Sequence, residues 1–252
     1  MKINLETHHP VAVESPDHIT PWGTKRDNHR NHRFNKKIYR LFEDKREPLH
    51  VLDLGCSGGG FVRDCVNDGC LAVGLEGSDY SFKLKRAEWA TIPQLLFTCD
   101  VTKPFQLTMD GASLSFDVVT AWEVLEHIRN EDLPMLCDNV KRHLRTNGLW
   151  ITSVAPTDDV VNGMNLHQTV KPMSWWISRM QELGLQHNPA YVSYFNTQFV
   201  RGPKFHAPGS FHLILSTQPL PAPPPLTTNI RMLDAWNGSG PQRLLKRLVL
   251  GD

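Results

Sequence analysis

Long apolar runs, a strong excess of charge and paired cysteine motifs are all absent from this sequence of 252 residues. Because no run reaches about 18 apolar residues, we expect no membrane-spanning helix. A formal net charge of +1 gives no electrostatic reason for general binding to nucleic acid or to membranes, so a nucleic-acid partner is not expected. Residues 1–10 contain no apolar run either, and we therefore expect no signal peptide.

The cysteines lack the spacing of a disulfide framework or of a zinc site. They are odd in number and include no Cys-x-x-Cys pair: Cys56, Cys65, Cys70, Cys99 and Cys137. Free thiols are typical of a reducing compartment, so we expect a cytoplasmic location. The sequence also lacks internal repeats, which argues against a solenoid or a propeller.

Short strand-like and helix-like runs alternate from residue 50 onward. The expected strands are 50–54, 71–75, 95–98, 116–120, 149–154, 190–195 and 211–216. The expected helices lie near 59–68, 80–90, 133–144 and 173–183. Such alternation predicts an α/β fold with a doubly wound, mainly parallel sheet. Ligands of such sheets bind beyond the carboxyl ends of the strands.

Three regions are expected along the chain. Residues 1–48 form a polar N-terminal arm followed by a helix, and residues 49–218 form the main domain. Residues 219–252 form a C-terminal extension with a proline-rich spacer and a basic amphipathic tail at 241–250. We expect this tail to dock on the chain's own core or on a second copy, with a membrane surface or another partner as the alternative. The sequence leaves the oligomeric state open.

The most informative segment is residues 51–61, where an apolar strand runs into a glycine-rich turn and then into a helix. Glycine has no Cβ and tolerates positive φ, so this turn lets the backbone approach a ligand closely. Beside a helix N-terminus, such a turn indicates a nucleotide-type site. Glu76 follows Gly55 by 21 positions on the next strand. A carboxylate at about that distance binds the ribose in dinucleotide folds.

The glycine spacing favours S-adenosylmethionine (SAM) over NAD as the cofactor. Gly55, Gly58, Gly59 and Gly60 do not fit the Gly-x-Gly-x-x-Gly pattern of dinucleotide enzymes. Asp53 precedes the turn, where a carboxylate would repel a pyrophosphate but would suit the ammonium of an amino acid. SAM has an amino-acid end and a ribose but no phosphate. An NAD oxidoreductase is therefore disfavoured and ranks third among the functions considered below.

Five segments in this order resemble the motifs of class I SAM-dependent methyltransferases, which have a Rossmann-like fold. The segments are residues 51–60, 73–78, 97–101, 116–128 and 148–152. Together they span roughly residues 49–155, and each falls at the end of an expected strand. The resemblance implies a SAM-dependent methyltransferase domain in which appended segments bind the acceptor. Those segments would be residues 1–48 and the insert after residue 155.

The resemblance also implies roles for individual residues. The turn at 55–59 would face the methionine part of SAM, with Asp53 behind it, and Glu76 would bind both ribose hydroxyls. Asp100 would accept from the adenine amino group, and Trp122 would flank the methionine or the acceptor. Ser57 departs from the family, whose members often have glycine there. The full cofactor set is Asp53, Gly55, Cys56, Ser57, Gly58, Gly59, Glu76, Gly77, Asp100, Val101 and Trp122.

A second cluster of polar residues begins after the strand at 116–120. On a helix, Glu123, Glu126 and His127 would share one face, because they are spaced i, i+3 and i+4. Without a cation, neighbouring carboxylates repel and raise each other's pKa. A divalent metal would remove that cost, and His167 follows the next strand as a fourth ligand. Direct acid/base work by His127 or His167 and a purely structural role stay open as alternatives.

This cluster resembles two methyltransferase groups. The ubiquinone-pathway O-methyltransferases carry a similar Glu-x-x-Glu-His and a later His followed by Lys-Pro, as at Lys171 and Pro172. The small-RNA 2′-O-methyltransferases hold a divalent ion with a comparable set. The resemblance implies Glu123, Glu126, His127 and His167 as ligands of Mg²⁺, Mn²⁺, Fe²⁺ or Zn²⁺.

The sequence thus predicts an O-methyltransferase that acts on a sugar, a glycan or a small aromatic acceptor. A nitrogen acceptor would need less help in losing a proton, so the Glu and His cluster favours oxygen. An RNA ribose 2′-O-methyltransferase is the first alternative, although the chain lacks the basic, aromatic-rich composition of an RNA binder. A SAM-binding subunit without catalysis is the second.

Overall fold

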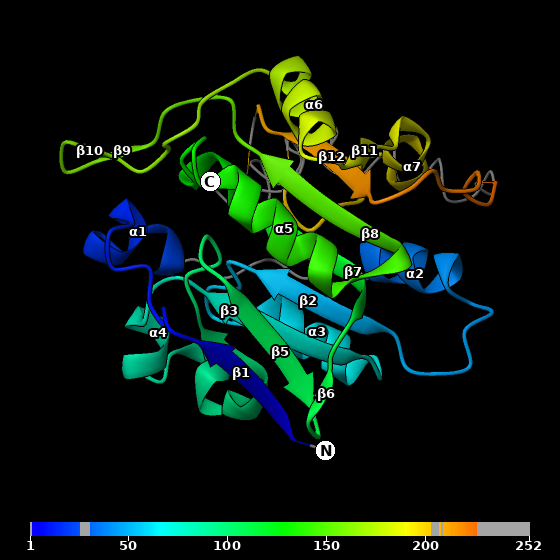
Figure 1. Cartoon of the computed structure of the whole chain (residues 1–252), viewed down its shortest axis with the longest axis horizontal. Coiled ribbons are helices and arrows are strands. Elements are labelled where there is room, and N and C mark those ends of the chain that lie inside the picture. The colour runs from blue at the N-terminus through cyan, green and yellow to red at the C-terminus, as the bar shows by residue number, and fades with distance from the viewer. Residues whose placement is uncertain (1, 26–30, 203–206, 208, 226–252) are drawn as a thin grey trace, which may run out of the picture.

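The computed structural model describes residues 2–25, 31–202, 207 and 209–225. Its centre is a seven-stranded sheet in the order β11-β12-β8-β7-β2-β3-β4 (Figure 1). The strands are β2 His50–Leu54, β3 Leu71–Glu76, β4 Leu96–Thr98, β7 Phe116–Trp122, β8 Leu144–Val154, β11 Gln186–His187 and β12 Phe211–Ser216. Within this sheet, β8, β7, β2, β3 and β4 pair in parallel. Strand β12 pairs antiparallel with β8, and β11 pairs antiparallel with β12. The predicted doubly wound, mainly parallel α/β fold is confirmed.

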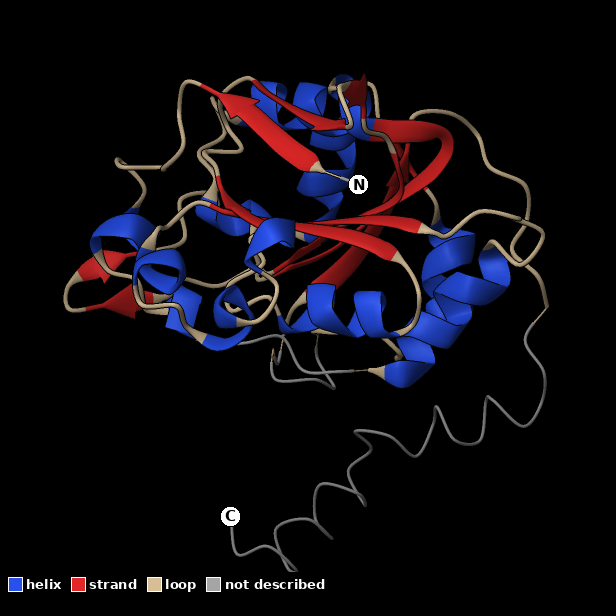
Figure 2. Cartoon of the chain, turned by 90° about the horizontal axis from the view of Figure 1, so that it is seen from below, coloured by secondary structure: helices blue, strands red, loops and turns tan. Residues whose placement is uncertain are grey.

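Helices lie on both sides of the central strands (Figure 2). The longer ones are α2 His32–Leu41, α3 Gly60–Asn67, α5 Leu133–His143, α6 Met173–Glu182 and α7 Pro189–Phe195. Two short helices, α1 Pro16–Ile19 and α4 Tyr80–Lys83, lie at one end of the sheet together with the hairpin of β9 Val160–Val161 and β10 Met164–Asn165 (Figure 1). Every residue of β7 is buried, because the strand has neighbours on both edges and cover on both faces.

Two expectations about secondary structure are wrong. Residues 190–195 form helix α7 instead of a strand, and the buried Tyr191, Tyr194 and Phe195 in it follow helical spacing. The helix expected near 80–90 splits into α4 and a 3₁₀ turn at Ala87–Ala90. The helix breaks because Lys85 and Ala87 take positive φ values of 47° and 45°.

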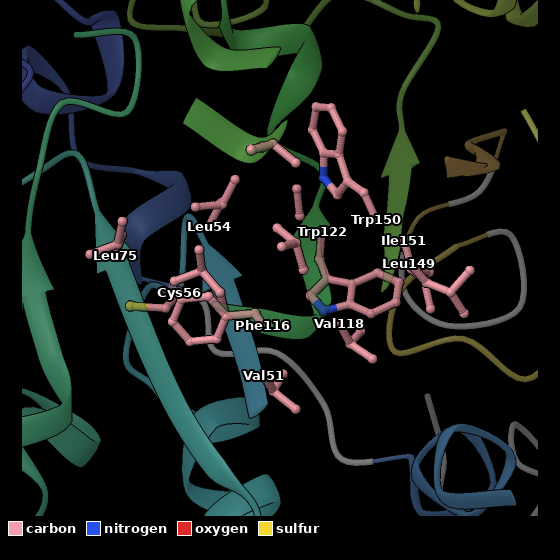
Figure 3. Packing of buried hydrophobic residues seen from close by; sticks show 14 of the residues in the cluster. Val51, Leu54, Cys56, Leu75, Phe116, Val118, Trp122, Leu149, Trp150 and Ile151 are labelled. Atoms are coloured by element: carbon pink, nitrogen blue, oxygen red, sulfur yellow. The ribbon is translucent and has the colours of Figure 1, made fainter. Parts of the chain in front are cut away.

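The core lies between the sheet and its helices. Figure 3 shows part of it, where Val51, Leu54 and Leu75 belong to β2 and β3, and Trp150 and Ile151 to β8. All five are at most 3% exposed. Burying a large aliphatic side chain contributes about 1.5–3 kcal/mol. The strands that carry the glycine turn and Glu76 are thus anchored in the buried core.

The N-terminal residues belong to the main fold instead of projecting from it. Strand β1, Ile3–Thr7, pairs antiparallel with β5, Phe105–Met109, which also pairs with β6, Ala112–Ser113. The chain then crosses the carboxyl ends of the central strands, since Asp100 N donates to His9 O at 3.0 Å and Ala12 N donates to Gly77 O at 2.9 Å. The polar arm expected at the start of residues 1–48 thus begins with a strand that belongs to a sheet, and the helix expected after it is α2.

In the part of the chain that the structure describes, no helix has the length and apolar character needed to cross a bilayer. The amphipathic tail expected at 241–250 lies outside the described residues.

Candidate functional site

A cavity of about 600 Å³ opens at the carboxyl ends of the central strands. It is bounded by the N-terminal segment, by the turns after β2, β3 and β7, and by the loop after β8. Ten of the residues predicted for the site line it: Gly55, Ser57, Glu76, Gly77, Asp100, Val101, Trp122, Glu123, His127 and His167. The other predicted residues are not on its wall: Asp53, Cys56, Gly58, Gly59 and Glu126.

Two glycines of the turn are required by its geometry. Gly55 has a φ of 67°, and a Cβ there would lie 2.5 Å from Cγ2 of Val124. Gly59, which precedes α3, has a φ of 86°, and a Cβ there would lie 2.7 Å from Cδ1 of Leu96. A larger residue at either position would strain the backbone and would force Val124 or Leu96 to shift. The turn therefore needs glycine at its start and at its end.

Ser57, where the resemblance led us to expect glycine, takes a left-handed conformation with a φ of 52°. Its backbone N–H donates to Oε2 of Glu76 at 2.7 Å. Its hydroxyl donates to the carbonyl of Thr24 at 2.8 Å and accepts from Arg86 at 3.2 Å. The serine thus ties the N-terminal segment to the glycine turn. No sequence signal identified Thr24 or Arg86 as its partners.

Glu76 is buried at the end of β3 and is held by backbone amides. Ser57 N bonds one carboxylate oxygen, and Ser78 N donates to the other at 3.2 Å. Burial raises the pKa of Glu76, and these bonds partly oppose that rise. Each oxygen keeps a lone pair for a further donor. The side chain is therefore suited to accept from two neighbouring ribose hydroxyls.

Asp53 and Asp100 occupy different environments. Asp53 is buried behind the turn, where it accepts from Oγ1 of Thr120 at 2.6 Å, and burial raises its pKa to about 7. Its other oxygen, Oδ2, has no hydrogen-bond partner among the described residues. Asp100 lines the cavity and uses Oδ1 to accept from N and Oγ1 of Thr102 at 2.9 and 2.6 Å. Asp100 therefore caps a turn and also faces the cavity.

Trp122 closes one wall of the cavity and is only 3% exposed. Its ring packs edge-to-face on Phe34 and Phe61, with centroids 5.2 and 6.0 Å apart. Its Nε1 is buried without a hydrogen-bond partner among the described residues. Trp122 therefore packs in the core and also forms part of the cavity wall.

Three of the four predicted metal ligands converge. One ligand atom each from Glu126, His127 and His167 lies within 4.8 Å of the other two. We call these residues the Glu-His-His trio. Glu126 is fully buried, and its Oε1 accepts from Ala155 N at 2.9 Å. Its Oε2 has no hydrogen-bond partner among the described residues, and burial raises its pKa.

The helix face expected for residues 123, 126 and 127 is wrong. Only a 3₁₀ turn at Leu125–His127 forms, and Glu123 before it has a φ of 57°. Ser153 holds that backbone, because its carbonyl and its hydroxyl accept from Glu123 N at 3.2 and 3.0 Å. Glu123 lies outside the trio. Its Oε2 accepts from Ser210 at 2.7 Å, and its Oε1 is buried without a hydrogen-bond partner among the described residues.

The two imidazoles of the trio are oriented by partners that the sequence did not reveal. Nδ1 of His127 lies 2.8 Å from Oδ2 of Asp17, and Nδ1 of His167 bonds the carbonyl of Thr157. The rings meet edge-to-face with centroids 4.6 Å apart. Asp17 thus lies at ion-pair distance from Nδ1 of His127, although the geometry is not that of a hydrogen bond, and Thr157 bonds Nδ1 of His167. Nε2 of each ring is therefore the nitrogen left for a ligand. Ser15 and Pro16 are a sequence signal for helix α1, but they do not indicate that Asp17 contacts His127.

The two rings also differ in charge. Burial by itself lowers the pKa of His127, but the neighbouring carboxylate of Asp17 and the charge of Glu126 outweigh it and raise the pKa to about 9. Burial lowers the pKa of His167, and the neighbouring His127 lowers it further. An imidazolium therefore lies beside a neutral imidazole near pH 7, an arrangement that separates an acid from a base.

Comparisons with known proteins identify the family of the chain. A family model described as a methyltransferase domain matches residues 26–199, more than half of the chain, whereas a search of curated protein sequences gives no match. A SAM-dependent methyltransferase from Clostridium acetobutylicum is 13% identical, with a TM-score of 0.52, over 75% of this chain and 93% of that one. Magnesium protoporphyrin IX methyltransferase from Synechocystis, solved with bound S-adenosylhomocysteine (SAH), is 13% identical, with a TM-score of 0.50, over 82% and 96%. At such identities the structures show a shared fold, and together with the family match they establish that the chain belongs to the methyltransferase domain family and is a class I SAM-dependent methyltransferase.

Proposed function

We propose that this methyltransferase acts on oxygen and transfers the methyl group of SAM to a hydroxyl of a sugar, a glycan or a small aromatic acceptor. The observation that carries the proposal is the Glu-His-His trio, whose ligand atoms lie within 4.8 Å of one another. A hydroxyl must lose its proton to attack the methyl group, whereas an amine attacks with a lone pair. A built cluster of proton-accepting and cation-binding groups therefore favours oxygen.

The cavity suits SAM on the side of the glycine turn. Its volume of about 600 Å³ is typical of small-molecule sites. Glu76 would bind the ribose hydroxyls, Asp100 and Val101 would contact the adenine, and the turn at residues 55–59 would face the amino-acid end. When bound, SAM supplies an electrophilic methyl group on its sulfonium. The protein's part is to align that methyl group with the acceptor oxygen, because displacement is in line.

The trio on the opposite side suits a divalent cation. The buried Oε2 of Glu126 has no hydrogen-bond partner among the described residues. Asp17 lies beside Nδ1 of His127 and Thr157 bonds Nδ1 of His167, so that Nε2 of each ring faces no such partner and could bind the ion. His127 would release its Nε2 proton when the ion binds. Glu123 is the fourth candidate ligand, since its charge raises the pKa of Glu126. When bound, the ion would lower the pKa of an acceptor hydroxyl. Carboxylate and imidazole donors leave Mg²⁺, Mn²⁺, Fe²⁺ and Zn²⁺ as candidates.

The proposal is tested by following SAH formation with a panel of acceptors, before and after removal of metal. The panel contains methyl glycosides, catechols, primary amines and a short RNA. We expect turnover with a hydroxyl acceptor, its loss in excess chelator and its return with an added divalent cation. Full activity in chelator, with a metal content near zero, would reject the ion and leave His127 or His167 as the base. Turnover with amines alone would reject the oxygen acceptor, and methylation of RNA ribose alone would favour the RNA alternative.

A further inference from the structure

The N-terminal segment of residues 8–25 lies across the cavity and contacts both of its sides. On the cofactor side, Asp100 N donates to His9 O, and Ala12 N donates to Gly77 O. Thr24 O accepts from the hydroxyl of Ser57. Between these attachments, the segment carries Asp17 to His127 of the trio. Asp17, which contacts the trio, therefore belongs to a segment whose other contacts attach it to the cofactor side.

The contact between Asp17 and His127 differs from an ordinary surface ion pair. Oδ2 of Asp17 and Nδ1 of His127 are 2.8 Å apart, and the side chains are only 20% and 14% exposed. Exposed pairs are screened by water and hold their partners loosely. Here the surrounding protein excludes most of the solvent, which strengthens the interaction and restricts the ring.

Local structure fixes the Asp17 side of the pair. Asp17 lies in the first turn of α1, where its backbone N–H donates to Oγ of Ser15 at 3.3 Å. Pro16 occupies the start of the helix, where its fixed φ is favourable. Thr20 N donates to Pro16 O at 2.7 Å and ends the helix. The carboxylate is therefore presented from a capped turn.

We propose that Asp17 is a positioning residue that holds the proton of His127 on Nδ1 and turns Nε2 toward the trio. This inference rests on the proposed function of the trio. A neutral imidazole has one donor and one acceptor nitrogen, and a carboxylate on one nitrogen fixes which is which. Thr157 plays the same part for His167 through its carbonyl. Together, two chain segments outside the trio direct both rings to one point.

The variant Asp17→Asn tests the proposal with little change in shape. Its amide can donate to Nδ1, which places the ring proton on Nε2 and leaves no lone pair there for the ion. With Mn²⁺ alone as the probe, we expect binding about 10- to 100-fold weaker than in the wild type, the usual effect of losing the partner of a metal-binding histidine. SAH affinity should stay within about twofold, because the cofactor residues are unchanged.

The matched control is Asp138→Asn. Asp138 also forms a 2.8 Å ion pair, with Lys141, but it is 54% exposed on α5 and lies outside the cavity. Mn²⁺ and SAH affinities should both stay at the wild-type level in this variant. Where the wild type binds Mn²⁺, an unchanged Mn²⁺ affinity in Asp17→Asn would overturn the proposal.

A second readout does not depend on any metal. In the SAH complex of the wild type, proton NMR should show a downfield, slowly exchanging proton on Nδ1 of His127, identified by its loss in His127→Gln. Asp17→Asn should remove or strongly shift this signal, and Asp138→Asn should not. If the wild type binds no divalent cation, the metal part of the proposed function fails and the NMR signal alone decides. An unchanged Nδ1 proton in Asp17→Asn overturns the positioning role in either case.

Discussion

The two sides of the cavity satisfy their buried polar groups in different ways. On the cofactor side, both carboxylate oxygens of Glu76 accept from backbone amides of neighbouring turns. On the trio side, Oε1 of Glu123 and Oε2 of Glu126 are buried without a hydrogen-bond partner among the described residues. Each such oxygen costs about 1–3 kcal/mol until something binds it.

This difference indicates different tasks. The cofactor side is preorganised by backbone hydrogen bonds, as expected for a site that binds the same molecule in every catalytic cycle. On the trio side, the buried oxygens of Glu123 and Glu126 stay available as hydrogen-bond acceptors or metal ligands. Glu123 also has a left-handed φ of 57°, which costs free energy. Buried acceptors and local strain together are typical of a site completed by an ion or a substrate.

Replacing Glu126, the carboxylate of the trio, should have the largest effect on turnover. In Glu126→Gln we expect turnover on the accepted hydroxyl, and Mn²⁺ affinity, to fall by about 100-fold or more. SAH affinity should not change, since Glu126 belongs to the trio and not to the predicted cofactor residues. Steady-state kinetics and calorimetry measure these values, and the exposed Glu182→Gln is the control. Equal loss of SAH binding would mean that the two sides are not separate.

Removing the carboxylate of Glu76, which is proposed to bind the ribose, should weaken binding on the cofactor side. Glu76→Ala removes a charged acceptor from two ribose hydroxyls, each bond contributing about 1.5–3 kcal/mol. SAH affinity should therefore fall by about 100-fold or more, while Mn²⁺ binding stays intact. Calorimetric titration checks this, with Glu182→Ala as the control. Wild-type affinity in a folded Glu76→Ala protein would remove Glu76 from the cofactor site.

Asp53 is the exception on the cofactor side, because one of its oxygens has no hydrogen-bond partner among the described residues. Burial raises its pKa to about 7 from an ordinary 3.8, so the folded state binds the proton more tightly than the unfolded state. Stability is therefore lost as the pH rises from about 4 to about 7. Asp53→Asn should abolish this loss and be more stable than the wild type by up to about 4 kcal/mol at pH 8.

Denaturant unfolding at pH 4.5 and at pH 8 measures the effect. The advantage of Asp53→Asn should be small at the lower pH and reach its full size above pH 7. An advantage that does not grow between the two pH values would show that Asp53 is ionised at an ordinary pKa in the folded protein.

Ser57→Ala should have the smallest effect. The change removes the hydroxyl that donates to Thr24 and accepts from Arg86, and keeps the positive φ. We expect a loss of about 1 kcal/mol in the free energy of unfolding. SAH affinity should change by less than about tenfold. The exposed Ser193→Ala is the control, and a much larger loss of SAH binding would mean that the hydroxyl itself contacts the cofactor.

The same contrast explains how much the sequence could predict. The glycine turn and Glu76 were predictable because the chemistry is local: strand, turn and helix are adjacent, and the next strand brings the carboxylate. The alternation of apolar runs predicted most of the strands along the chain and the mainly parallel sheet, but not the order of the strands in it. Helix α7 was missed because Tyr191, Tyr194 and Phe195 are strand-favouring residues that follow helical spacing over only seven positions.

The trio side was predicted in composition but not in geometry. The residues after β7 suggested a helix face, whereas Ser153 on the adjacent strand holds Glu123 in a left-handed turn that its residue type does not favour. Asp17 and Ser210 reach the site from positions that are distant in sequence, 110 residues before His127 and 87 after Glu123. Contacts at such separations depend on the complete fold and leave no local pattern.

The most direct test of whether the two sides bind their ligands independently is to titrate both SAH and Mn²⁺ into each of the variants Glu76→Ala and Glu126→Gln. The account predicts that Glu76→Ala loses SAH binding and keeps Mn²⁺ binding, and that Glu126→Gln does the reverse. Loss of both ligands in either folded variant, or Mn²⁺ binding that survives in Glu126→Gln, would contradict it.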